Sequence, residues 1–167
     1  TLPARSLRAT RCARLMSRVH TPACRPYPLS LALRSASSPV ANAVTDSTGG
    51  LLAFARMDGA FAVSGSIAQD KAWTVAGFGG IPTDDFYDAI AGEDAVREGI
   101  AQRGRVAAFG GGVPVLVDGV LVGAVGASGG SAAQDKQVAT SGAQAVVAAL
   151  TSASPTHPSP TEGEDAR

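Results

Sequence analysis

A chain of 167 residues, of which 45% are hydrophobic, has the length of one domain and enough apolar residues for its own core. The formal net charge is zero, but residues 1–45 contain seven Arg and no acidic residue, so the remaining seven basic and fourteen acidic residues give the rest of the chain a net charge of −7. An acidic globular part argues against a nucleic-acid-binding protein, and no apolar run reaches the ~20 residues of a membrane-spanning helix.

Residues 1–38 form a leader rich in Arg, Ser, Ala and Pro. This composition fits three hypotheses: an organellar transit peptide, a mis-assigned start or reading frame, and a basic arm that touches anionic surfaces. We expect the leader to be disordered or artefactual and unnecessary for folding, in a cytoplasmic protein, whereas a genuine transit peptide would make the protein organellar. Cys12 and Cys24 lie in this leader at a spacing that fits neither a CxxC redox motif nor a zinc site.

Residues 39–150 carry the pattern of a single domain whose core, built mainly from Ala and Val, requires close backbone approach. Residues 40–46 and 51–57 are β-prone runs separated by a Gly-rich turn, and they predict a first hairpin. Residues 67–78 predict a helix that Ser64 or Ser66 can cap, because a short side-chain oxygen accepts hydrogen bonds from first-turn amides.

The middle of the chain predicts two short helices and a strand. Thr83 can cap the first helix, whose opening turn contains Asp84 and Asp85 near the positive end of the helix dipole. Residues 95–102 predict the second helical segment, and residues 105–109 predict a third strand.

The clearest local signal is a second hairpin over residues 113–125. Two Val-rich runs, 113–117 and 120–125, flank Asp118-Gly119, the composition of a type I′ turn in which both central residues need positive φ. Ser131 and Gln134 then form a capping box that opens a helix to about Leu150. Residues 151–167 are Ser, Thr, Pro and acid without periodicity, and we expect a disordered tail.

The stretch from Gly110 to Asp135 resembles the signature of the GlcG/HbpS family, also described as the haem-degrading or PduO C-terminal-like domain. The likeness extends upstream through Arg56-Met57-Asp58-Gly59-Ala60 and Asp70-Lys71-Ala72 in the family's order and spacing. The resemblance implies an α/β domain of the α+β kind, with a five-stranded antiparallel sheet flanked by helices in a profilin-like arrangement. It also implies assembly into homo-oligomers and, for some members, haem binding.

Two glycine-rich segments are candidates for anion binding. No helix follows Gly110-Gly111-Gly112, which argues against a nucleotide site there. Ser128, Gly129 and Gly130 lead directly into the last helix, so their backbone could hold an anion. The structural alternative is that the glycines are needed only for a tight turn between strand and helix.

Three further residues predict a ligand site. Arg56 ends a strand, and Lys71 and Thr74 lie three residues apart on one edge of the next helix. We predict that Arg56, Lys71 and Thr74 bind a small organic anion or a haem propionate. The alternative is an ion pair between Lys71 and either Asp58 or Asp135 that fixes the helix or a subunit interface.

Both histidines, His20 and His157, lie outside residues 39–150. The domain therefore has no imidazole for haem ligation or general-base catalysis, and we predict no metal site and assign no catalytic residue. Haem iron would have to use Met57, Tyr87, a lysine, a leader histidine, or no strong protein ligand.

The resemblance, rather than the residue chemistry, favours an oligomeric haem- or tetrapyrrole-binding protein. An alternative is an accessory protein or enzyme that acts on small hydroxy- or oxo-acids, since relatives are associated with glycolate and diol metabolism. A third possibility is a purely structural oligomer that assembles through small-residue surfaces. The sequence leaves open whether the protein is an enzyme.

Overall fold

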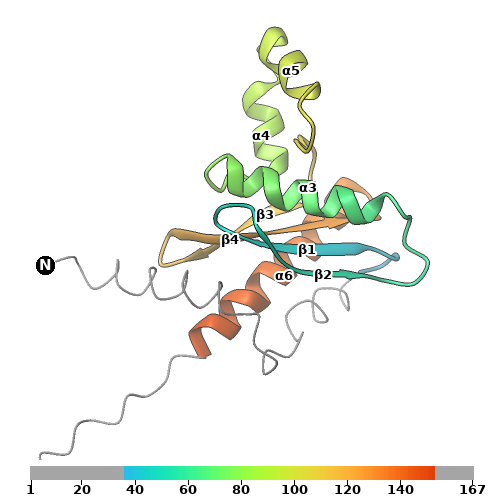
Figure 1. The fold of residues 1–167 in the computed structure, drawn as a ribbon, viewed down its shortest axis with the longest axis vertical. Coiled ribbons are helices and arrows are strands. Elements are labelled where there is room, and N and C mark those ends of the chain that lie inside the picture. Colours follow the sequence, from blue (N-terminus) through green and yellow to red (C-terminus); the bar gives the residue numbers. More distant parts are fainter. Residues whose placement is uncertain (1–35, 153–167) are drawn as a thin grey trace, which may run out of the picture.

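A computed structural model of the chain describes residues 36–152 (Figure 1). The expectations for residues 1–35 of the leader and 153–167 of the tail lie outside these described residues. No helix within the described range is long and apolar enough to cross a membrane. In chain order the elements are β1 Ala41–Asp46, β2 Leu51–Arg56, α3 Ser64–Gly77, α4 Thr83–Ile90, α5 Asp94–Ala101, β3 Gly112–Val117, β4 Val120–Ser128 and α6 Ala132–Ser152.

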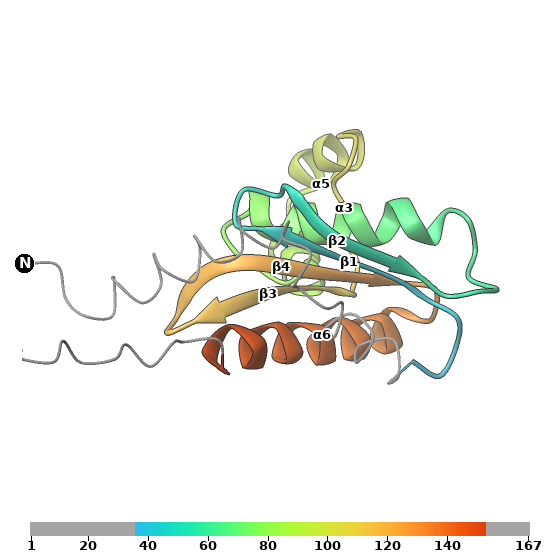
Figure 2. The same ribbon diagram turned by 60° about the horizontal axis from the view of Figure 1, so that its bottom comes forward.

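The fold is of the α+β kind, with one antiparallel sheet between helices. The strand order is β2-β1-β4-β3, so β1 and β4 are central and β2 and β3 form opposite edges. Helix α3 packs on one face and α6 packs on the other, against β3 and β4 (Figure 2). Helices α4 and α5 project away from the sheet (Figure 1), and α5 has no buried residue.

The prediction of five strands is wrong, because residues 105–109 do not form a strand in the described chain. Arg105 has a positive φ of 71°, which interrupts an extended backbone. The hydroxyl of Thr74 on α3 accepts a hydrogen bond from the Ala107 N–H at 2.9 Å and lies 3.2 Å from the Arg105 carbonyl oxygen. The side chain of Thr74 therefore acts as the hydrogen-bond partner that a neighbouring strand would otherwise be for this backbone.

Both predicted hairpins are confirmed. Asp118 and Gly119 have φ values of 51° and 79°, the positive pair that a type I′ turn requires. The first hairpin is closed by Asp46, whose Oδ1 accepts hydrogen bonds from the amides of Thr48 at 2.8 Å and Gly50 at 2.9 Å. Side-chain hydrogen bonding to the turn backbone explains why this loop forms without a type I′ dipeptide.

Close approach between α3 and the sheet depends on small residues. A Cβ on Gly126 of β4 would lie 2.0 Å from the Ala68 carbonyl oxygen of α3. Ala41 and Ala43 on β1 are completely buried against the same helix. The opposite face of the sheet is richer in valine, and its buried side chains pack with those of α6. The expected core of Ala and Val is confirmed.

The helix positions agree with the predictions better than their caps do. Val63 and Pro82 precede α3 and α4 without side-chain capping bonds, so the predicted caps at Ser64, Ser66 and Thr83 are wrong. The Thr83 hydroxyl instead accepts a hydrogen bond from the Gly112 N–H at 2.9 Å, which ties α4 to the sheet. The capping box at the start of α6 is confirmed, with both of its reciprocal hydrogen bonds present.

Candidate functional site

The predicted site residue Lys71 is completely buried between α3 and the start of α6. Its Nζ donates hydrogen bonds to Asp135 Oδ2 at 2.8 Å and to the Ala127 carbonyl oxygen at 2.9 Å. The ring centroid of Phe109 lies 4.6 Å from the same atom. A lysine ammonium has three donors, so two hydrogen bonds and one aromatic ring account for all of its directions.

Asp135 provides the other half of this buried junction. Its Oδ1 accepts a hydrogen bond from the Gly130 N–H at 2.9 Å, while Oδ2 faces Lys71. The neighbouring Ser131 N–H donates to Gln134 Oε1 at 2.9 Å. Side chains of α6 thus occupy the amides of Gly130 and Ser131, two of the donors that an external anion could use before this helix.

Glycines make room for the junction. A Cβ on Gly111, whose φ is +121°, would lie 2.7 Å from Lys71 Nζ and 2.7 Å from Asp135 Cβ. A Cβ on Gly129, whose φ is +145°, would lie 2.4 Å from the Pro39 carbonyl oxygen. The tight-turn explanation offered for the segment of Gly129 therefore has a direct steric basis.

Burial lowers the pKa of Lys71, and its hydrogen bond and charge interaction with Asp135 oppose that shift. The ion pair between Lys71 and Asp135 is one of the two pairs considered in the sequence. It connects α3 to α6 at the end of β4, where a buried charge without its partner would be strongly unfavourable. The contacts of Lys71 are those of a structural group.

The other two predicted residues lie elsewhere. Thr74 faces the segment before β3, where its hydroxyl is used by Ala107. Arg56 is exposed at the end of β2, and one of its terminal nitrogens donates to the Ala60 carbonyl oxygen at 3.1 Å. The structure brings Lys71 together with the turn at Gly129 and Gly130 through Asp135, but it does not join Arg56, Lys71 and Thr74 in one cavity.

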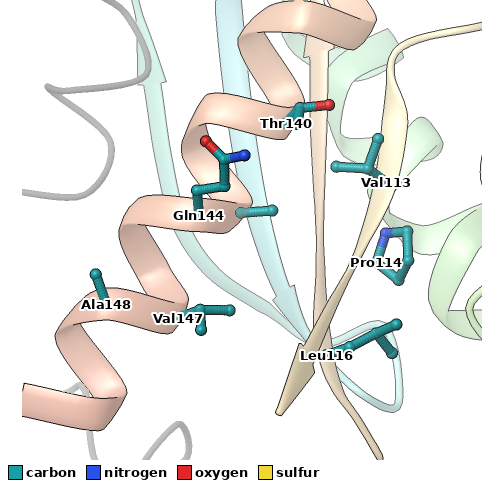
Figure 3. Close-up of a pocket in the computed structure, with 8 residues that line it drawn as sticks. Val113, Pro114, Leu116, Thr140, Gln144, Val147 and Ala148 are labelled. Carbon is teal, nitrogen blue, oxygen red and sulfur yellow. The ribbon is translucent and has the colours of Figure 1, made fainter. Parts of the chain in front are cut away.

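A groove that the sequence analysis missed lies between the edge strand β3 and α6 (Figure 3). It has a volume of about 440 Å³, within the roughly 300–1,000 Å³ of small-molecule sites. Two features of the sequence could have indicated this groove. Pro114 favours an edge strand, and the small residues of α6 leave space beside it. The apolar lining residues are Val113, Pro114 and Leu116 from β3 and Ala143, Val147 and Ala148 from α6.

The groove lining carries no charge. Its two polar residues are Thr140, whose hydroxyl donates to the Lys136 carbonyl oxygen within α6, and Gln144, which is exposed. One turn before Thr140, the ammonium of Lys136 pairs with the carboxylate of Asp84 on α4. That contact raises the pKa of Lys136. Because no charged side chain lines the groove, it can hold an uncharged, apolar part of a ligand beside the amide of Gln144.

Comparisons with known proteins agree on one family. Residues 30–144 match the family model described as "Haem degrading protein HbpS-like". An uncharacterized 15.0 kDa protein from the dhaT-dhaS intergenic region of Citrobacter freundii is 37% identical over 102 residues, which cover 60% of this chain and 71% of that protein.

Two solved structures have the same fold. The Klebsiella pneumoniae protein ORFY has a TM-score of 0.64 and 27% identity, and the match covers 83% of this chain and 89% of that one. The PduOC:haem complex has a TM-score of 0.59 and 27% identity, with coverage of 87% and 94%.

Proposed function

This chain belongs to the HbpS-like family, and we propose that it binds haem or a related tetrapyrrole. The observation that supports the proposal is the similarity to the PduOC:haem complex, which extends over 87% of the chain. The apolar groove of about 440 Å³ adds a surface suited to part of a macrocycle. Burial of apolar ligand surface would supply most of the affinity, because residues 36–152 contain no histidine.

The predicted anion-binding residues differ in their availability to a haem propionate. Lys71 can reach a ligand only if its contact with Asp135 breaks. Arg56 is exposed and can pair with a carboxylate, but it lies on β2, at the edge of the sheet opposite to β3. Arg56 and the groove lie at opposite edges of the sheet, so mutations can test the two locations separately.

A haem titration of the full-length protein tests the function. We expect a saturable Soret shift with one haemin per chain, and we expect it to persist in His20→Ala and His157→Ala, since both histidines lie outside residues 39–150. The absence of saturable binding in the wild-type protein would contradict the proposal. Loss of binding in His20→Ala alone would place the iron ligand in the leader.

We also propose that the protein is a homo-oligomer. Several large apolar side chains are exposed in the described part of the chain, among them Phe61 at 71% and Val63 at 60%. Exposed apolar surface of this kind is typical of protein interfaces when it is contiguous. Light scattering at tens of micromolar should give a mass above 16.7 kDa, and a monodisperse monomer would refute this part of the proposal.

The second candidate function is binding or conversion of a small hydroxy- or oxo-acid. The exposed guanidinium of Arg56 favours it, because a single backbone oxygen leaves most of its five donors for a carboxylate. Calorimetric titration with glycolate would test this candidate. Binding that disappears in Arg56→Ala would support it, whereas equal binding by both proteins would exclude Arg56 as the anchor.

A further inference from the structure

We infer that the edge strand β2 pairs with the same strand of a second copy of this chain, antiparallel about a two-fold axis at Phe54. This inference rests on the proposed homo-oligomer, and it names the surface through which two copies meet. Strand β2 lies at one edge of the sheet (Figure 2), where it pairs with β1 and with no other strand of residues 36–152.

The backbone of β2 is the first argument. The Met57 N–H donates to the Val40 carbonyl oxygen at 3.0 Å, in the antiparallel pair of β2 with β1. In such a pair, residues that bond to the neighbouring strand alternate with residues that do not. The N–H and C=O groups of Phe54 and Arg56 therefore point away from β1. An edge that presents unpaired backbone groups in this way is a template for a further strand.

The second argument is that β2 lacks the features by which proteins protect an exposed edge. Its six residues include no Pro and no Lys, and its single charged residue, Arg56, lies at its end. The opposite edge strand is protected, because Pro114 lies within β3 and α6 packs against that strand. Of the two edges of the sheet, β2 is therefore the one that is open to pairing.

Exposed apolar side chains lie at the same edge. Phe54 is 42% exposed and Leu51, at the start of β2, is 47% exposed. A Cβ on Gly65, in the first turn of α3, would lie 3.2 Å from the Phe54 ring, and the exposed Phe61 and Val63 come just before that turn. Unpaired backbone and exposed apolar side chains therefore occur together here, as expected for an interface.

A second copy of β2 is the strand that fits this edge. In an antiparallel pair centred on Phe54, each Phe54 lies opposite its counterpart, and Arg56 lies opposite Leu52 of the partner subunit. Aromatic pairs across strands are favourable, whereas a two-fold axis at Arg56 would place two like charges opposite each other. Pairing about Phe54 keeps the two arginines apart and uses the same patch on both subunits, as a two-fold interface requires.

Opposite charges at position 54 give a test that depends on the two-fold axis. In the full-length protein, Phe54→Lys and Phe54→Glu should each weaken self-association by about tenfold or more, because each places two like charges opposite each other. An equimolar mixture of the two variants should recover the assembled mass, since the opposing charges then attract. The control is Leu116→Lys on the other edge strand, at a similar exposure of 46%, which should assemble as the wild type does.

Light scattering measures the mass, and thermal melts verify that each variant is folded. Amide hydrogen exchange of the wild-type protein needs no substitution: the amides of Phe54 and Arg56 should be protected at concentrations where the protein is assembled. Rapid exchange of both amides in the assembled protein would overturn the pairing and leave the proposed oligomer intact. So would an unchanged mass of Phe54→Lys, a mixture that stays dissociated, or loss of assembly confined to Leu116→Lys. A monomeric wild-type protein would refute both the oligomer and the pairing.

Discussion

Replacement of Lys71 by methionine tests the role of the buried junction. Methionine keeps the length and apolar stem of lysine and removes the ammonium. In the variant, Asp135 keeps its hydrogen bond from Gly130 but loses the cation 2.8 Å away, at a side-chain exposure of 4%. Removal of one partner from a buried pair costs about 3–5 kcal/mol, which is a large part of the roughly 5–15 kcal/mol that stabilises a typical domain.

Urea unfolding of the full-length chain, followed by circular dichroism, measures this loss. With an m-value of about 2 kcal/mol per M, the midpoint should fall by about 2 M. The double variant Lys71→Met/Asp135→Asn should recover part of the stability, since asparagine can still accept from Gly130 and no charge remains buried. A loss below about 1 kcal/mol for the single variant, or a double variant no more stable than it, would refute the structural role of the pair.

Three other consequences follow from packing, hydrogen bonding and charge. Gly126→Ala should destabilise by at least about 1–3 kcal/mol in urea unfolding, because its Cβ has no room beside α3, whereas Gly77→Ala, with no atom within 4 Å, should not. Thr74→Val should cost about 1–3 kcal/mol in the same assay, since the buried Ala107 N–H loses its acceptor; an unchanged midpoint would contradict that bond. Burial raises the pKa of Asp46, but hydrogen bonds in its turn outweigh this and hold the pKa below the ordinary 3.8. Its contribution is therefore present above pH ~4 and lost as the pH falls through the folded-state pKa, so Asp46→Asn should flatten the stability curve below pH 4.

The sequence predicted local structure well where neighbouring residues determine it. Asp118-Gly119 and the capping box of Ser131 and Gln134 act within four residues, and both are confirmed. The strand at residues 105–109 failed because its backbone partner is Thr74, about 30 residues earlier in the chain. No local pattern shows that a helix hydroxyl, and not a neighbouring strand, is the hydrogen-bond partner of the Ala107 amide.

The candidate site shows the same division. The sequence identified Lys71 and the turn at Gly129 and Gly130 and named Asp135 as a possible partner, but it could not show that burial closes this place to ligands. The groove arises where α6 passes beside the edge strand β3, and it depends on strand order and helix position. Strand order and helix position follow from tertiary packing, so residue types alone did not predict the groove.

The strand order also determines how the chain must assemble. Each hairpin pairs strands that are adjacent in sequence and can close within microseconds. The central pair, β1 with β4, instead places Asp46 opposite Gly123, and α3, α4 and α5 all lie between these two residues in the chain. Closing that loop carries a large entropic cost, so docking of the two hairpins should be the slow step of folding. A chain cut at Gly92, in the exposed connection between α4 and α5, would leave one hairpin and one long helix in each half. Refolding of the two halves should then become bimolecular, with a rate that rises with their concentration.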